Sequence, residues 1–326
     1  MSRPASDSQD ERKNALAAMK KALISGSPGA SRSARRFVVH GAPIPAPPLE
    51  RGLYIVATPI GNLGDVTLRA LAVLAGADGV LAEDTRLSRT LLAHYGIDTP
   101  LSPYHEHNAA EARPLALRRM TEGQALALVS DAGTPLISDP GYKLVAESIA
   151  SGLAVSAAPG ASAALAALCM AGLPTDRFFF EGFLPPKSAA RRERINALAN
   201  VPGTLLFYEA PTRLAESLAD LALELGPRPA AVARELTKLH EEVRRGALDV
   251  LAAEYAAAGA PKGEIVIVVG AGEQRTAVSQ DALDRDLLEA LRTLSVKDAA
   301  AAIAARHGLP RRQVYARALE LAAGSR

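Results

Sequence analysis

The sequence predicts an α/β protein with two lobes and a small helical domain at its C-terminal end. Between residues 53 and 269, apolar runs of four to six residues alternate with stretches of helical periodicity, which is typical of sheets covered by helices. Gly, Pro and Asp separate the runs, as expected of connecting loops. Beyond Gly272 only helical patterns follow. With 326 residues, 48% of them hydrophobic, the chain is long enough for two or three domains, and a disordered or fibrous protein is excluded.

Residues 1–48 differ from the rest of the chain in composition. They are rich in Ser, Pro, Arg and Ala, show no sustained apolar period, and end in a cluster formed by Pro43, Pro45, Pro47 and Pro48. Such a segment has too little apolar surface to offset the entropy lost on ordering. We therefore expect a disordered basic extension over 1–48.

The first series of alternating elements predicts an N-terminal α/β domain over residues 49–172. The expected strands are 53–57, 79–82, 125–129 and 153–156, and the expected helices lie near 66–74, 88–95, 108–120 and 143–150. This alternation implies a parallel sheet, and ligands of such sheets bind at the carboxyl ends of the strands. The loops after the strands are therefore where a functional site is expected.

A second series predicts a C-terminal α/β domain over residues 173–274, joined to the first at Leu173-Pro174. Its expected strands are 177–180, 204–208, 230–233 and 264–269, with helices near 189–199, 213–224 and 248–257. Residues 275–326 then form a helical appendix, with helices expected at 281–294, 295–306 and 311–322. Ser295 and Asp298 have the spacing of a capping box that starts the second of these helices.

The formal net charge of +2 is unevenly distributed along the chain. Residues 1–48 hold eight basic and three acidic residues, 49–274 hold 20 and 26, and 275–326 hold nine and six. The whole-chain value by itself favours neither a nucleic-acid partner nor an acidic one. The two ends are basic, however, and the middle is acidic.

The sequence also indicates a cytoplasmic protein without a membrane span. Cys169 is the only cysteine, so a disulfide within one chain and a cysteine-based zinc site are both excluded, which favours a reducing compartment. The longest apolar stretch, 161–172, is about half the length that a membrane helix needs. An apolar signal sequence is not expected, because Lys20 and Lys21 interrupt the stretch 14–24.

Three loops after strands of the first series are rich in small residues. They are 58–65 (TPIGNLGD), 130–135 (SDAGTP) continued by 138–141 (SDPG), and 158–163 (APGASA), which opens an apolar helix. Small residues allow the backbone to approach a ligand closely, and a helix N-terminus offers free N–H groups. Each loop taken alone also fits an ordinary turn or helix start.

Charged groups end several of the expected strands. They are Glu83-Asp84-Thr85-Arg86, residues 207–213 (FYEAPTR) and residues 234–241 (RELTKLHE). Surface salt bridges and helix caps would explain them equally well from spacing alone. The motifs GxSxG, SxxK and HExxH are absent, and no metal site is expected. From the residues alone, the chain is an α/β enzyme with a loop-built site for a small polar cofactor.

Taken together, these loops resemble a known family. The segments 57–63 (ATPIGNL), 82–86 (AEDTR), 130–135 with 138–141, 207–209 (FYE) and 234–238 (RELTK) are similar to those of the bacterial 16S rRNA 2′-O-ribose cytidine methyltransferases, members of the tetrapyrrole methylase superfamily. The resemblance covers residues 52–270 with a compatible helical tail. Ala161 departs from the family pattern, as do Ala210-Pro211-Thr212.

The resemblance implies a two-lobed class III methyltransferase fold, a homodimer, and S-adenosylmethionine (SAM) bound in the cleft between the lobes. The first loop lacks the Gly-Pro-Gly of relatives that act on tetrapyrrole precursors, which favours the RNA branch. The implied cofactor-binding residues are Pro59, Asp131, Ala132, Gly133, Pro159, Gly160, Ala161, Ser162, Tyr208, Glu209, Arg234 and Gly263.

The implied reaction is attack of a ribose 2′-oxygen on the sulfonium methyl group. A ribose hydroxyl is a poor nucleophile, so a base or a cation should assist it. The candidates are Glu83 or Asp84 as the base, with Arg86 and Lys238 stabilising the oxygen or holding phosphate.

Binding of 16S rRNA in the small ribosomal subunit needs cations, which neutralise phosphates. The candidates for RNA contact are Lys187, Arg191, Arg192, Arg194, Arg306, Arg311, Arg312 and Arg317. Two alternatives remain open at this point. One is a methyltransferase acting on a small tetrapyrrole precursor, and the other is a non-catalytic RNA-binding module in ribosome assembly.

Overall fold

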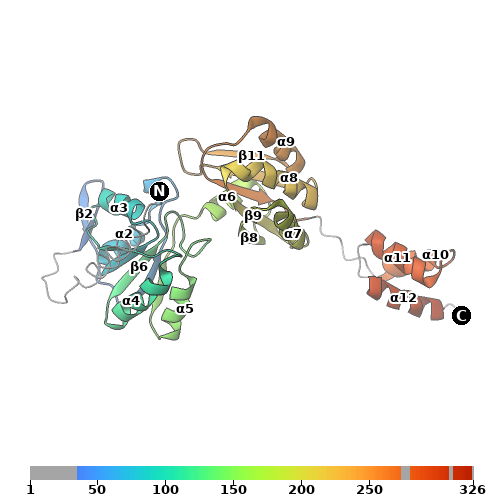
Figure 1. Ribbon diagram of the computed structural model, residues 1–326, viewed down its shortest axis with the longest axis horizontal. Helices are drawn as coiled ribbons and strands as arrows, with labels where there is room; N and C mark the ends of the chain where they lie inside the picture. The colour runs from blue at the N-terminus through green and yellow to red at the C-terminus, as the bar shows by residue number, and fades with distance from the viewer. Residues whose placement is uncertain (1–34, 273–279, 308–310, 325–326) are drawn as a thin grey trace, which may run out of the picture. The chain divides into compact units, whose positions relative to one another are not determined.

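The structure is a computed structural model that describes residues 35–272, 280–307 and 311–324. The chain divides into two compact units, the first ending at Gly270 and the second beginning at Ala271. Within the described residues, the first unit contains two five-stranded sheets and a two-stranded hairpin, and the second unit contains helices (Figure 1).

The first sheet is parallel throughout, with the strand order β5-β4-β6-β3-β7. Its strands are β3 (Gly52–Val56), β4 (Gly79–Ala82), β5 (Leu101–Pro103), β6 (Ala125–Val129) and β7 (Val155–Ala158). Its helices are α2 (Leu68–Gly76), α3 (Thr85–His94), α4 (Ala109–Thr121) and α5 (Tyr142–Ala150). The chain connections from β3 and from β6 lead to opposite sides of the sheet, so the switch point lies between these two neighbouring strands. At such a point the carboxyl ends of the strands leave a crevice for ligands.

The side chains of β6 point alternately to the two faces of this sheet, and helices cover both faces. Leu126 and Leu128 pack with residues of α4 and α5, whereas Ala127 and Val129 pack with residues of α2 and α3. Successive side chains of a strand point to opposite faces, so a strand buried on both sides is apolar throughout. The strands predicted at 53–57, 79–82 and 125–129 are confirmed, whereas the fourth begins two residues later than predicted. Strand β5 was not predicted, because three residues are too few to show a period.

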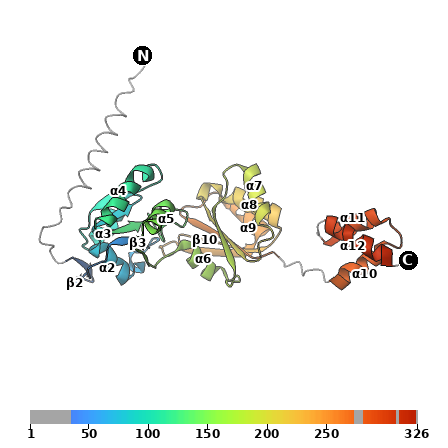
Figure 2. The same ribbon diagram turned by 90° about the horizontal axis from the view of Figure 1, so that it is seen from below.

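The second sheet is mixed, with the strand order β11-β10-β12-β9-β8. Its strands are β8 (Phe178–Phe183), β9 (Thr204–Glu209), β10 (Pro229–Arg234), β11 (Glu242–Ala247) and β12 (Ile265–Val269). Only β8 and β9 are parallel to each other; the other neighbours are antiparallel. Helices α7 (Ser188–Leu198), α8 (Leu214–Leu225) and α9 (Leu248–Ala258) cover one face (Figure 2). Strand β11 was missed because its sequence EVRRGA is charged and lies at the sheet edge.

Helix α6 (Ala163–Ala171) covers the other face of the second sheet. Ala164, Ala167, Leu168 and Ala171 are buried there, at the i, i+3, i+4 and i+7 spacing of one helix face. The sequence places this helix in the N-terminal domain, with the join after it at Leu173-Pro174. In the structure the chain passes from the first sheet to the second before the helix, at the loop that follows β7.

Residues 36–45 correct the expectation of a disordered extension over 1–48. They form a hairpin of β1 (Arg36–Val39) and β2 (Ala42–Pro45), turned at His40 and Gly41, both with positive φ. Phe37 is 2% exposed and belongs to the apolar cluster of α2 and α3, and the backbone N–H of Val38 donates to the carbonyl of Tyr95. One buried aromatic ring thus anchors a segment whose composition suggests disorder. Residues 1–34 lie outside the described residues.

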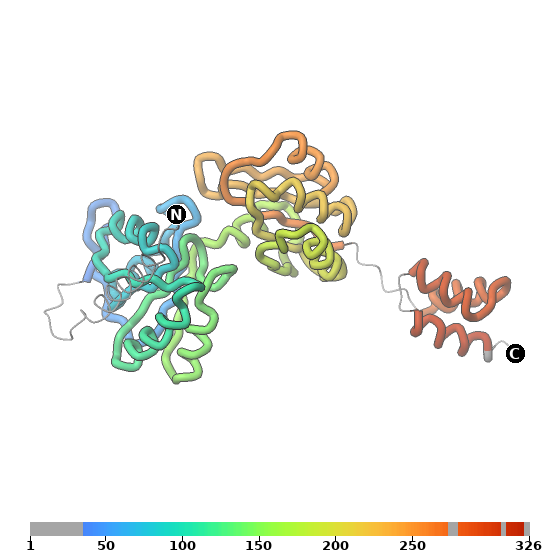
Figure 3. The backbone as a smooth tube through the Cα atoms, viewed as in Figure 1, coloured from blue at the N-terminus to red at the C-terminus, as the bar shows by residue number. Residues whose placement is uncertain are grey.

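The second unit is a cluster of three helices in the described residues, traced in Figure 3: α10 (Gln280–Ala290), α11 (Val296–His307) and α12 (Arg311–Gly324). They enclose a small apolar core that includes Leu287, Ile303 and Val314. The serine half of the predicted capping box is confirmed, because the hydroxyl of Ser295 accepts from the backbone N–H of Asp298; the same hydroxyl donates to the carboxylate of Asp298. No helix in the described part of the chain is long and apolar enough to cross a membrane.

The hairpin gives a first test of this fold. We expect Phe37→Ala to lower the free energy of unfolding by about 3 kcal/mol, because truncating a buried ring leaves a cavity. Chemical denaturation measures the change. Arg36→Ala, at an exposed neighbouring position, is the control and should change it by less than about 0.5 kcal/mol. Equal stability of the two variants would show that the hairpin does not stabilise the first unit.

Candidate active site

The three small-residue loops predicted from the sequence meet at the carboxyl ends of β3, β6 and β7. Thr58, after β3, and Gly133, after β6, exchange two backbone hydrogen bonds of 2.9 and 3.0 Å. The hydroxyl of Thr134 donates to the carbonyl of Ala161, after β7, at 3.0 Å. Gly133 has a φ of +79°, which favours glycine, and a Cβ there would lie 3.3 Å from the side chain of Ile60. The loops therefore form one connected surface.

The third loop leads directly into α6, whose N-terminus is capped by the hydroxyl of Ser162, which accepts from the backbone N–H of Leu165 at 3.4 Å. Pro159 and Gly160 are exposed just before it, and Ala161 is half-buried. Tyr208, from β9, hydrogen-bonds the backbone of Ala164, and burial raises the pKa of its hydroxyl. The helix start thus presents free backbone to solvent next to an aromatic side chain of the second sheet.

A fourth loop joins the cluster from β4. The backbone N–H of Asp84 donates to a carboxylate oxygen of Asp131 at 2.8 Å, which ties the loop after β4 to the loop after β6. Partial burial raises the pKa of Glu83, and the negative charges of Asp131 and Asp139 raise it further. Asp139 is a site residue that the sequence motif contained but that sequence reasoning did not single out. Burial raises its pKa too, although a hydrogen bond from Ser130 acts in the opposite direction.

Asp84 differs from Glu83 in its electrostatic state. Its carboxylate caps α3 and forms an ion pair of 2.6 Å with Arg86, whose side chain is exposed. Hydrogen bonds from the side chain and the backbone of Arg86 lower the pKa of Asp84 to about 2. Asp84 is therefore a weak base held as a carboxylate, which leaves Glu83 as the stronger candidate of the two.

Lys238 brings a cation from the second sheet to the first loop. Its side chain lies directly over Gly61, where a Cβ would collide with it. Its ammonium group donates to Glu235 at 2.8 Å and to Glu264 at 3.0 Å. Burial acts to lower the pKa of Lys238, but these hydrogen bonds outweigh it and the pKa is raised. Lys238 consequently remains a cation at neutral pH.

Backbone strain is concentrated in the loops of this site. The described residues include five non-glycine positions with positive φ, and four of them are Leu136, Ser138, Glu235 and Thr237. Strained positions of this kind cluster at ligand sites, because the surrounding structure must hold them. Thr237 also has a buried hydroxyl without a hydrogen-bond partner among the described residues. Sequence reasoning did not single out Ser138 or Thr237.

Two of the predicted cofactor residues, Glu209 and Arg234, already form ion pairs with other side chains. The carboxylate of Glu209 is buried on the α8 side of the second sheet, where it accepts from Arg213 at 2.7 Å and from Ser217 at 2.5 Å. It therefore holds β9 to α8. Arg234 donates to Glu242 at 3.2 Å on the neighbouring strand. Gly263 lies against the side chain of Glu235, and so it borders the Lys238 network.

The predicted RNA contacts need a larger correction. Arg191 is 2% exposed and pairs with Asp220 at 2.7 Å, so it is a structural residue of the second lobe. Arg192, Arg194 and Arg317 are held in ion pairs of 2.5 to 2.6 Å with Glu224, Glu181 and Asp284. Arg306 is 67% exposed and lies 3.6 Å from Asp286. Lys187, Arg311 and Arg312 are exposed. The charge available to RNA in the described residues is therefore smaller than the sequence suggests.

No group of three or more His, Cys, Asp or Glu side chains that could hold a metal ion occurs in the parts of the chain that the structure describes. The loop cluster itself contains carboxylates, one lysine and backbone groups. Such an arrangement can bind a small polar cofactor and remove a proton from a hydroxyl group.

Comparisons with known proteins agree with this arrangement. The family described as Tetrapyrrole (Corrin/Porphyrin) Methylases matches residues 52–252, and the RsmI C-terminal HTH domain matches residues 277–322. The chain is 53% identical to "Ribosomal RNA small subunit methyltransferase I" of Mesorhizobium japonicum, over 85% of this chain and 95% of that protein. It is 46% identical to the protein of the same name from Escherichia coli O157:H7, over 82% of this chain and 94% of that protein.

Solved structures share the fold at low sequence identity. Diphthine synthase superposes with a TM-score of 0.53 at 17% identity, covering 67% of this chain and 89% of that one. A conserved hypothetical protein from Aeropyrum pernix K1 superposes with a TM-score of 0.54 at 21% identity, covering 85% and 98%. These two comparisons establish the two-lobed fold.

The buried arginine gives a test of the corrected assignment. We expect Arg191→Ala to lower the free energy of unfolding by about 3 kcal/mol, because it leaves the carboxylate of Asp220 buried without its partner. Denaturation measured by circular dichroism reports the change. Lys187→Ala, at an exposed position, is the control and should be nearly neutral. A stable Arg191→Ala protein with weakened RNA binding would restore the original prediction.

Proposed function

Because the chain belongs to the ribosomal RNA small subunit methyltransferase I family of the tetrapyrrole methylases, we propose that it uses SAM to methylate the ribose 2′-oxygen of a cytidine in 16S rRNA of the small ribosomal subunit. The single observation that carries the proposal in this chain is the contact of Lys238 with the first loop. It brings a permanent cation to the same loop cluster as Glu83.

The residues present fit the cofactor. The loops offer exposed backbone at Ala132 and Gly160, and Asp131 lies at their edge as a hydrogen-bond acceptor. The unpartnered hydroxyl of Thr237 supplies a polar group that a ligand can satisfy. We assign cofactor binding to these groups with Pro59, Gly133, Pro159, Ala161, Ser162, Tyr208 and Gly263. When bound, SAM supplies an electrophilic methyl group on a sulfonium.

The chain's own residues position and activate the ribose. Glu83 accepts the proton of the 2′-hydroxyl, because its raised pKa makes it a better base than an ordinary carboxylate. Lys238 stabilises negative charge on the oxygen or holds the adjacent phosphate, and its raised pKa prevents it from acting as the base. Arg86 is exposed next to Asp84, with which it pairs, and can contact the RNA backbone. Alignment of the reacting groups contributes further, roughly 7–11 kcal/mol in well-oriented reactions.

RNA binding in this proposal relies on the helical unit. Arg311 and Arg312 begin α12 and are exposed, and Arg306 ends α11 with an exposed side chain. Arg317 is not included, because it holds α12 to α10 through Asp284. Cations on a helix of this kind bind phosphates independently of sequence.

We further propose a cytoplasmic homodimer. Phe178, Phe179 and Phe183 are exposed on β8, which is an edge strand, and such apolar patches favour protein contacts. Light scattering that gave only a monomer mass would contradict the dimer.

The methylation assay tests the proposal directly. Purified protein is incubated with methyl-labelled SAM and small ribosomal subunits from cells that lack the modification, and the labelled nucleoside is mapped. We expect label on one 2′-O-methylcytidine. Label on a tetrapyrrole precursor and none on RNA would favour the small-molecule alternative, and SAM binding without any transfer would favour a non-catalytic module.

The same assay tests the base. Glu83→Gln should reduce kcat by roughly 10²- to 10⁴-fold, the usual contribution of a general base. In the wild-type protein, kcat should fall as the pH drops through the pKa of Glu83, because protonation removes the base. That decline should begin at a higher pH than for an unperturbed glutamate, since the pKa is raised. Asp84→Asn is the comparison. If Asp84→Asn lost kcat to this extent and Glu83→Gln kept the wild-type kcat, Asp84 would be the base instead.

The role of α12 is tested through salt dependence. The double variant Arg311→Ala with Arg312→Ala should weaken subunit binding and flatten its dependence on salt, because about two fewer counterions are released. The affinity for SAM, measured by calorimetry, should be unchanged. Arg285→Ala, at an exposed position of α10, is a control within the same unit. An unchanged salt slope in the double variant would exclude this contact.

A further inference from the structure

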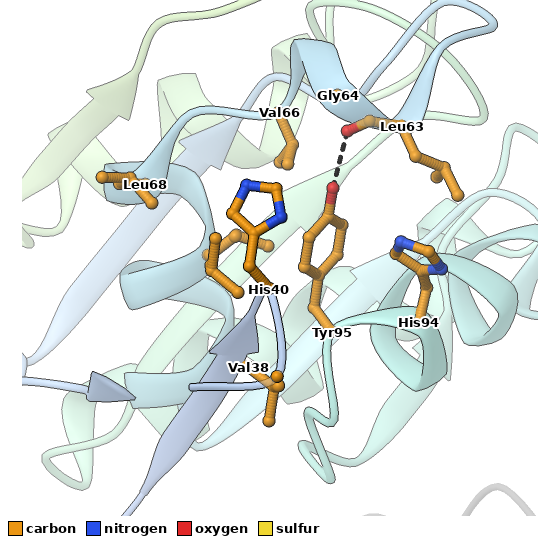
Figure 4. A pocket seen from close by; sticks show the side chains of 11 residues that line it. Val38, His40, Leu63, Gly64, Val66, Leu68, His94 and Tyr95 are labelled. Carbon is orange, nitrogen blue, oxygen red and sulfur yellow. Dashed lines mark hydrogen bonds between the residues drawn. The ribbon is translucent and has the colours of Figure 1, made fainter. Parts of the chain in front are cut away.

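A pocket of about 550 Å³ opens in the first unit between the β1–β2 hairpin and the end of the first loop (Figure 4). Val38 and His40 contribute from the hairpin, Leu63 and Val66 from the loop, and His94 and Tyr95 from the end of α3. None of the residues discussed for the cofactor lines it. The hairpin side of the pocket precedes residue 52, where the match to the tetrapyrrole methylases begins.

Three rings from two elements line this pocket. The rings of His94 and Tyr95 are edge to face, with 4.7 Å between their centroids. Tyr95 is 9% exposed, and its hydroxyl donates to the carbonyl of Leu63 at 2.7 Å, so its ring is fixed. The histidines differ from it, because His40 and His94 are both exposed. The pocket therefore combines a rigid apolar floor with two accessible flat rings at its rim.

The pocket is connected to the candidate active site in two ways. Leu63 belongs to the same loop as Gly61, which lies under Lys238. Helix α3 begins beside Asp84 and Arg86 and ends at His94, so one helix of ten residues, about 14 Å long, leads from the carboxylates to the pocket. Its exposed face carries Arg86 and Arg89. Basic side chains thus lie on α3 between the candidate active site and the pocket.

We propose that this pocket receives an unpaired base of the substrate RNA strand, near the nucleotide that is methylated. The inference rests on the proposed function. Single-stranded RNA is recognised by stacking of splayed bases on flat side chains, and His is among the residues used. The volume is within the range of ligand pockets, and the exposed Arg89 of α3 suits the phosphates between the two sites. A nucleobase matches the apolar floor and the flat rings together.

The experiment measures KM for unmethylated small ribosomal subunits in the full-length protein. His94→Ala should raise this KM by roughly tenfold, the effect of losing one stacked base, with kcat and the Kd for SAM unchanged. His94→Phe keeps a flat ring and should retain the wild-type KM to within about twofold. His40→Asn should act in the same direction as His94→Ala; Asn is chosen because it tolerates the positive φ at this position. Thermal melting confirms that each variant is folded.

His107→Ala is the matched control, since His107 is an exposed histidine outside the pocket. An unchanged KM in His94→Ala, or an equal rise in His107→Ala, would overturn the inference. A KM in His94→Phe as high as in His94→Ala would also overturn it, because stacking would then not be the cause. If wild-type protein methylates subunits and these variants do not differ, only the pocket assignment fails; if wild-type protein methylates no RNA, the proposed function fails first.

Discussion

The first loop is held by both sheets of the first unit, and the candidate active site depends on this constraint. Thr58 is bonded to the loop after β6, Ile60 is 6% exposed and packs in the apolar cluster between α6 and the second sheet, and Gly61 lies under Lys238. A side chain at position 61 would displace the lysine. Fixing one short loop from both sides therefore brings a cation of the second lobe onto a loop of the first.

Within this frame, the carboxyl groups at the strand ends are not equivalent. Arg86 neutralises Asp84 and lowers its pKa, whereas Glu83 and Asp139 lie in more buried surroundings that raise theirs. Environments that separate the pKa values of neighbouring groups are how one site obtains both a permanent charge and a proton acceptor. The salt bridge with Arg86 thus keeps Asp84 charged, while Glu83 and Asp139 hold their protons more readily.

Several basic residues form ion pairs that hold the fold together, which limits their availability for binding phosphate. Arg191 joins α7 to α8 through Asp220, and Arg317 joins α12 to α10 through Asp284. A guanidinium that is already paired with a carboxylate has less to offer a phosphate, because the pair must first separate. Arg311 and Arg312 of the helical unit are exposed, and they are therefore better placed than the paired arginines for the proposed contact with RNA.

The sequence by itself determined the parallel sheet and the three loops at its carboxyl ends. The apolar run over β6 and the small residues at 58–65, 130–135 and 158–163 are local patterns, and the periodicity and turn chemistry of a segment act locally. Only the tertiary structure decided that α6 covers the second sheet, that Phe37 anchors the hairpin, and that Glu209 points away from the loops. Each of these features depends on contacts between residues that are far apart in the sequence. Burial and ion pairing across such distances leave no periodic trace in the sequence.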